Sequence, residues 1–127
     1  MSTFRTPLKR ALVLGSAKHG VHHFLVQRLT AIALVLLGLW FVWFALRLPG
    51  LDYAAARALL AEPVNALLML LFVVAVFWHA QLGLQVVVED YVHTSGWQLV
   101  LQVAIRFLCV LGGAACVLAI LRIALGR

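Results

Sequence analysis

The chain has 127 residues, enough for one domain, and 65% of them are hydrophobic whereas only 11% are charged. A soluble domain carries about 25% charged residues, so this composition excludes a water-soluble globular protein and indicates a bilayer as the solvent. The formal net charge of +6 would suit a nucleic-acid partner in a soluble protein. Here the basic residues lie mainly at the ends of apolar segments. This pattern favours contact with membrane lipid, and no nucleic-acid partner is expected.

The first 28 residues form a basic arm. They lack the early apolar core and the small-residue cleavage site of a secretory signal peptide, so no cleaved signal is expected. Within the arm, the stretch GSAKHG at 15–20 is typical of a bend. Five basic residues lie in the arm, and they are Arg5, Lys9, Arg10, Lys18 and Arg28.

Three apolar segments follow, at 29–46, 64–88 and 97–121. A helix needs about 20 residues to cross a hydrocarbon core of about 30 Å, and lipid leaves no solvent for open backbone groups. The sequence therefore predicts an all-α integral membrane protein with three transmembrane helices in one domain. Pro63 suits the first turn of the second helix, and the short connection 93–96 makes the second and third helices antiparallel neighbours.

The distribution of basic residues predicts the orientation. The arm carries more of them than the first loop, where Arg47 and Arg57 are offset by Asp52 and Glu62. Lys and Arg concentrate in cytoplasmic segments. We expect a cytoplasmic N-terminus and, after three crossings, a C-terminus on the opposite side.

One histidine lies within the second apolar segment, in the stretch FWHAQLGLQVVVEDYVH at 77–93. At 100° per residue, His79 shares a helix face with Ala75 and Gly83, and these small neighbours would leave room for a flat macrocycle. Ionisable groups at this depth are costly and usually functional. The imidazole either hydrogen-bonds a neighbouring helix or binds a metal. A six-coordinate haem would need its second axial ligand from another chain.

Asp90 and Tyr91 end this segment, about 18 Å along the axis from His79 at 1.5 Å per residue. A tyrosine at a membrane edge is common as an interfacial anchor. A phenol beside carboxylates could also donate a hydrogen bond to a quinone carbonyl and help to relay its protons.

Two motifs, SAKHGVHHFLVQRLTAIAL at 16–34 and HAQLGLQVVVEDYVH at 79–93, resemble the small hydrophobic membrane-anchor subunit of succinate dehydrogenase, in its alphaproteobacterial and mitochondrial-like branch. With the three-helix plan, the resemblance covers nearly the whole chain. It implies a bacterial inner-membrane complex in which a flavoprotein and an iron–sulfur subunit oxidise succinate on the cytoplasmic side. Two anchors would pack into one bundle, share a b-type haem and reduce ubiquinone, and this chain would not be an enzyme on its own.

The resemblance also implies residue roles. His79 corresponds to the axial ligand of the haem iron, and the second anchor subunit would supply the other ligand. Tyr91, with Asp90 beside it, corresponds to the hydrogen-bond donor to the quinone. His22 and Arg28 match positions near the haem propionates.

Alternatives remain open at this stage. They are a fumarate reductase-type anchor, a small transporter or proton-pathway subunit that uses His79 and Asp90, and an assembly scaffold without a cofactor. His23 is assigned no role. Arg106 lies within the third segment, with only 15 uncharged residues (107–121) beyond it, so it should extend to the headgroups or face a protein carboxylate or a propionate.

Overall fold

The computed structural model describes residues 17–126, which contain helices and no strand. The helices are α2 (Ala17–Leu46), α3 (Tyr53–Ala61), α4 (Pro63–Tyr91) and α5 (Ser95–Ala124). Three of them, α2, α4 and α5, are long and apolar enough to cross a membrane. The prediction of an all-α protein with three membrane-spanning helices is therefore confirmed, and each predicted segment lies within one of these helices. The first 16 residues of the predicted arm lie outside the described residues.

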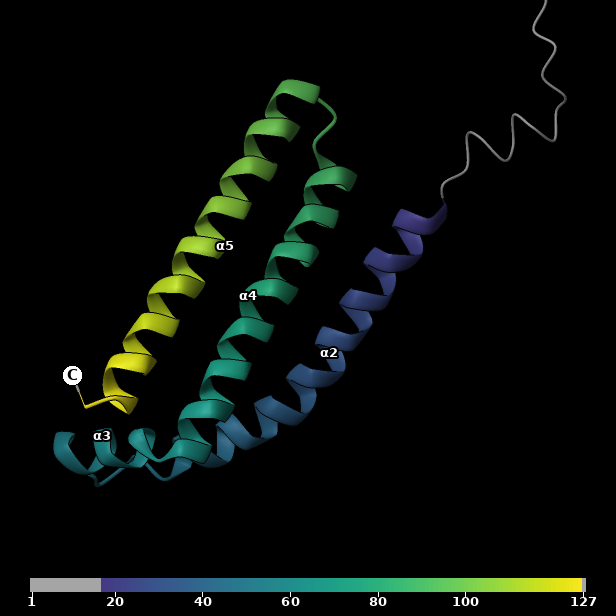
Figure 1. The fold of residues 1–127 in the computed structure, drawn as a ribbon. Coiled ribbons are helices and arrows are strands. Elements are labelled where there is room, and N and C mark those ends of the chain that lie inside the picture. The colour runs from purple at the N-terminus through teal and green to yellow at the C-terminus, as the bar shows by residue number, and fades with distance from the viewer. Residues whose placement is uncertain (1–16, 127) are drawn as a thin grey trace, which may run out of the picture.

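The long helices form one layer with α4 in the middle (Figure 1). Helix α4 packs against α2 on one side and against α5 on the other, whereas the backbones of α2 and α5 do not approach each other within residues 17–126. The short α3 lies across the end of the layer and contacts α4 and α5 (Figure 1). Many large apolar side chains on α2, α4 and α5 are exposed, so residues 17–126 leave much of this layer uncovered.

The first loop contains a helix that the sequence reasoning did not predict. Asp52 is the N-cap of α3, and its side chain accepts a hydrogen bond of 2.7 Å from the backbone N–H of Ala55. Asn65 is buried at the corner between α3 and α4, where its amide donates to the Leu59 carbonyl at 2.9 Å and to Glu62 at 2.8 Å. Pro63 lies in the first turn of α4, as predicted. These contacts fix α3 against the start of α4.

The interface between α4 and α5 depends on two adjacent glycines. A Cβ atom placed on Gly112 would lie 2.8 Å from the Phe77 ring, and one on Gly113 would lie 3.4 Å from it. Small residues permit close approach of membrane helices. The Phe77 ring therefore fills the space that side chains at these positions would take.

The predicted bend at 15–20 is wrong for the residues that the structure describes there, because Ala17–Gly20 are already helical. Helix α2 therefore runs from the arm through the first span without a break, and His22, His23 and Arg28 belong to the same rigid element as Thr30. Extending an existing helix adds one backbone hydrogen bond per residue fixed, which outweighs the cost of about 1 kcal/mol for a glycine such as Gly20.

Candidate functional site

The imidazole of His79 is oriented by a threonine on the neighbouring helix. Its Nδ1 atom lies 3.0 Å from the hydroxyl oxygen of Thr30 on α2. The same hydroxyl donates to the backbone carbonyl of Gln27 at 3.0 Å. Because a threonine hydroxyl has only one proton to donate, its oxygen accepts from His79 Nδ1–H. This arrangement favours the neutral tautomer with its proton on Nδ1 and its lone pair on Nε2.

The Nε2 atom of His79 has no hydrogen-bond partner among residues 17–126, and this chain does not enclose it. A histidine that binds a metal usually donates its other ring N–H to an oxygen, which fixes the tautomer and the ring orientation. His79 has this arrangement within a single chain. Its Nε2 atom is therefore available as a ligand to a group that approaches from outside the chain.

The two small residues on the His79 face lie in different surroundings. Ala75 is only 9% exposed, and Phe72, one turn further along, stacks on Phe41 of α2 with ring centroids 4.6 Å apart. This part of the face is therefore filled by α2. A Cβ atom on Gly83 would meet nothing within 4 Å, so the room for a macrocycle that the sequence predicted exists only on the Gly83 side of His79.

Asp90 and Tyr91 lie at the end of α4, and both side chains are exposed, that of Tyr91 by 79%. Neither has a side-chain hydrogen bond or an ion pair within residues 17–126. These two consecutive residues therefore lie at one end of the bundle, and the Tyr91 hydroxyl and the Asp90 carboxylate are accessible to another molecule.

His22 and Arg28 are both exposed on α2, and the Arg28 guanidinium lies 5.1 Å from the centre of the Phe24 ring. Within residues 17–126, neither residue has a hydrogen bond or an ion pair with His79 or with the other. The contact between Thr30 and His79 fixes the register of α2 against α4. Arg28 is two residues before Thr30, so it lies about 3 Å from His79 along the bundle axis.

A second histidine on α2 has an unusual environment. The Nε2 atom of His23 is buried and has no hydrogen-bond partner within residues 17–126. His23 lies seven residues before Thr30, which is two helical turns, so the two side chains share a face of α2. A buried polar atom without a partner is costly, and sequence reasoning gave no reason to expect one here.

Sequence reasoning also missed a group of polar side chains between α4 and α5. Glu89 accepts hydrogen bonds on one oxygen from the amides of Gln85, at 2.9 Å, and Gln102, at 3.3 Å. Arg106 lies beside the same glutamines. The spacing of four residues between Gln81, Gln85 and Glu89 is a signal that could have indicated this polar edge of α4.

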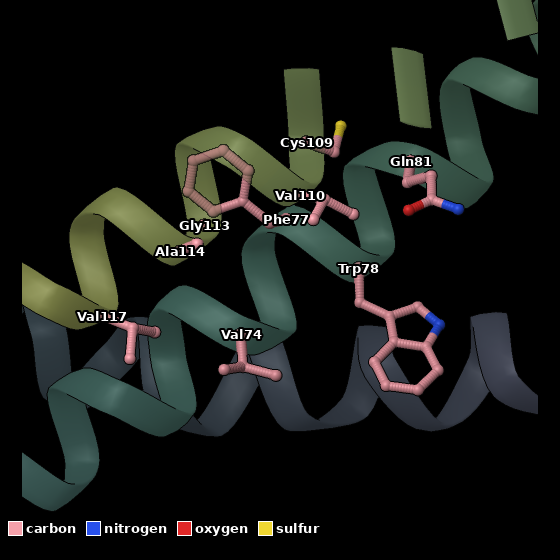
Figure 2. A pocket seen from close by; sticks show the side chains of 9 residues that line it. All are labelled: Val74, Phe77, Trp78, Gln81, Cys109, Val110, Gly113, Ala114 and Val117. Carbon is pink, nitrogen blue, oxygen red and sulfur yellow. The ribbon is translucent and has the colours of Figure 1, made fainter. Parts of the chain in front are cut away.

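An open groove of about 240 Å³ continues from these polar residues along the α4–α5 interface (Figure 2). Gln81 lies at one end of the groove, and Val74 and Val117 lie at the other (Figure 2). The Trp78 ring beside it is 52% exposed. The groove is mainly apolar, and it is distinct from the contact between His79 and Thr30 on the α2 side of α4.

Three membrane-length helices in one layer, with an oriented imidazole on the middle helix and little buried surface, define a multi-pass helical membrane protein. The family described as succinate dehydrogenase/fumarate reductase transmembrane subunit matches residues 2–120. The chain belongs to this family, so the resemblance seen in the two sequence motifs is confirmed.

The curated relatives agree with this assignment. A succinate dehydrogenase hydrophobic membrane anchor subunit of Rickettsia bellii is 38% identical over 117 residues, which cover 92% of this chain and 94% of the relative. The protein of the same name from Rickettsia conorii is 34% identical over 118 residues, with the same coverage of 92% and 94%. That of Paracoccus denitrificans is 34% identical over 86 residues, or 68% of this chain and 67% of the relative.

Proposed function

We propose that this chain is the small membrane-anchor subunit of a succinate:ubiquinone oxidoreductase, and that His79 is an axial ligand of a b-type haem shared with a second anchor subunit. The observation that carries the proposal is the contact of 3.0 Å between His79 Nδ1 and Thr30. It leaves Nε2 unprotonated and open at the surface of the chain, which is the state that an iron ligand requires.

The residues around His79 fit a haem on one side only. The space beside Gly83 would accept the edge of a macrocycle, whereas the Ala75 side is filled by α2. A six-coordinate haem needs two axial ligands, and this chain supplies one, so the second anchor would supply the other. A bound b-type haem would accept and donate single electrons. The role of this chain is to hold the imidazole in one tautomer and one orientation.

We assign the cytoplasmic end of α2 to the haem propionates. Arg28 presents five N–H donors that suit carboxylates, and it lies close to the level of His79 along the bundle. His22 lies six residues earlier on the same helix. Both side chains are exposed, so they can reach a carboxylate that lies between this chain and its partner.

We assign the end of α4 to ubiquinone. Reduction of a quinone to a quinol takes two electrons and two protons, so the site needs hydrogen-bond donors and a proton source. The Tyr91 hydroxyl would donate a hydrogen bond to a quinone carbonyl, and the neighbouring Asp90 carboxylate would pass protons from water. Replacing Asp90 by Asn should lower quinone reduction, because an amide cannot carry a proton in this way.

The same proposal sets the location and the partners of the chain. The complex would lie in a bacterial inner membrane with the N-terminus of this chain in the cytoplasm and its C-terminus in the periplasm. The flavoprotein and iron–sulfur subunits would bind on the Tyr91 side and carry the succinate chemistry, so this chain has an anchoring and electron-transfer role without catalysis of its own.

Reduced-minus-oxidised absorbance of the purified complex tests this function. A b-type spectrum that depends on His79 is expected for the haem-bearing anchor. A complex that assembles and oxidises succinate without such a spectrum would instead identify a cofactor-free scaffold. Preferential fumarate reduction with a low-potential quinol would identify the fumarate reductase-type anchor.

A further inference from the structure

The charged and polar residues between α4 and α5 lie close to one edge of the hydrocarbon layer. Phe77 lies against Gly112, which sets the register of the two helices. The two helices are antiparallel, so Gln81, four residues after Phe77, and Arg106, six residues before Gly112, both lie toward the same end of the bundle. Their positions along the bundle axis differ by two residues, or about 3 Å at 1.5 Å per residue. The Thr30 contact places Arg28 at the level of Gln81. From this level, 18 uncharged residues of α2 (29–46) cover about 27 Å, nearly the thickness of a hydrocarbon core.

Arg106 is a cation without a partner at this level. The structure gives its guanidinium no ion pair or hydrogen bond to any of residues 17–126, and its side chain is exposed. It lies beside Gln81, Gln85 and Gln102, and these side chains leave no room for a ligand among them, so an anion would reach the guanidinium from its exposed side. An uncompensated guanidinium at the edge of hydrocarbon requires an anion or water, and lipid phosphates lie at this depth.

Glu89 supplies the opposite charge further from the hydrocarbon. One of its oxygens accepts from Gln85 and Gln102, and its other oxygen has no partner within the described residues. Gln102 precedes Arg106 by one turn and bonds to Glu89, so a single glutamine separates the two charges. From the hydrocarbon outward, the order is a cation, then amide donors, then an anion.

The apolar groove begins on the hydrocarbon side of this polar cluster. Gln81 belongs to the cluster and also lines the groove. From there the groove runs between Trp78 on α4 and Val110, Ala114 and Val117 on α5 (Figure 2). It therefore extends along the bilayer normal in the direction that an acyl chain takes from its headgroup.

We propose that this face binds a phosphatidylethanolamine molecule, with its phosphate on Arg106, its ammonium on the free oxygen of Glu89 and one acyl chain in the groove. In this lipid a two-carbon linker joins the phosphate to the ammonium, and the long side chains of Arg106 and Glu89 would close the difference of about 9 Å between their levels. An anionic lipid without an ammonium would place no group on Glu89. Gly83, where the haem-sharing partner must approach, is about 160° around α4 from Gln81, so the lipid and the partner use different faces.

The test uses the whole complex, purified in a mild detergent and partly delipidated. Phosphatidylethanolamine, phosphatidylglycerol or phosphatidylcholine is added back, and native mass spectrometry measures the fraction of complexes that retain each lipid. The wild type should retain phosphatidylethanolamine preferentially. At about 1 kcal/mol per charge near the membrane surface, Arg106→Gln should lower retention of all three lipids by about fivefold.

Glu89→Gln should remove the preference for phosphatidylethanolamine and leave retention of phosphatidylglycerol unchanged. Arg122→Gln, at the other end of α5, is the matched control and should have no effect. Ala114→Phe keeps both charges and fills the groove, so it should lower retention of every lipid even if an Arg106 variant fails to assemble.

Three results would overturn the proposal. They are a wild-type preference for phosphatidylglycerol or for no lipid, equal effects of Arg106→Gln and Arg122→Gln, and loss of the second anchor subunit from the Arg106→Gln complex. The last result would mean that a carboxylate of the partner pairs with Arg106. None of these outcomes depends on haem binding by His79, because subunit composition and lipid retention are read from the same spectrum.

Discussion

Thr30→Val is the most informative change, because valine has nearly the shape of threonine and lacks the hydroxyl. In the structure this hydroxyl is the only partner of His79 Nδ1 within residues 17–126. Its loss leaves the Nδ1–H without an acceptor and releases the preference for the tautomer with a bare Nε2. The substitution should therefore weaken haem binding without removing the ligand itself.

The expected size follows from the hydrogen bond that is lost. A buried donor left without its acceptor costs about 1–3 kcal/mol, which is about 5- to 140-fold in affinity at 1.4 kcal/mol per decade. Loss of a hydrogen-bond partner of a metal-binding histidine typically costs 10–100-fold in metal affinity or activity. The two ranges overlap, so we expect a decrease of the order of tenfold in haem affinity.

Haem content per complex, from reduced-minus-oxidised absorbance, measures this effect at limiting haem. Thr30→Ser keeps the hydroxyl and should restore the wild-type content, which separates the hydrogen bond from packing at the α2–α4 interface. Succinate oxidation with an artificial dye should be unchanged in both variants. Wild-type haem content and an unchanged spectrum in Thr30→Val would refute the argument that this contact prepares His79 as a ligand.

Further substitutions test the other assignments. His79→Leu should remove or strongly reduce the b-type spectrum and preserve dye-linked succinate oxidation, and full haem content would exclude His79 as the ligand. Tyr91→Phe should lower quinone reduction about 2- to 12-fold, from a hydrogen bond worth about 0.5–1.5 kcal/mol, with haem content unchanged; an equal fall in dye reduction would instead make Tyr91 a structural anchor. Gly112→Ala should destabilise the complex by about 1–3 kcal/mol in thermal unfolding, because the new methyl would lie 2.8 Å from the Phe77 ring. Gly38→Ala, which meets nothing within 4 Å, is its control and should be neutral or stabilising.

The number and type of the long helices could be predicted from the sequence, because lipid restricts a chain of this composition to helices. The uncharged segments at 29–46 and 64–88 were unambiguous in length. The short α3 could not be predicted in the same way. Its residues, YAAARALLA at 53–61, are too few to span a membrane, and α3 is held by the Asp52 cap and the Asn65 corner contacts.

His79 could be singled out because an imidazole within an apolar segment is unusual. Its orientation could not be predicted, because Thr30 lies 49 residues earlier in the chain and the contact depends on the register of α2 against α4. The same reason applies to Arg106 and Glu89. Gln102 bonds to Glu89 and lies beside Arg106. This grouping depends on the close packing of Phe77 on Gly112, which no local pattern in the sequence encodes.

In the proposed haem site, this chain orients one axial ligand, and another chain would supply the second. One tautomer of His79 is favoured within the chain, by the Thr30 hydroxyl that lies between the Gln27 carbonyl and Nδ1. The Nε2 atom, the space at Gly83 and the Tyr91 hydroxyl are all left open. The helix α4 lies between α2 and α5 (Figure 1), and the Thr30 contact places His79 on the α2 side of α4, so a partner would approach it from the side away from α5. A second anchor that packs on the Gly83 face would therefore bring its own ligand to the iron and cover one face of the layer, and the α4–α5 groove on the opposite face would still be open to lipid.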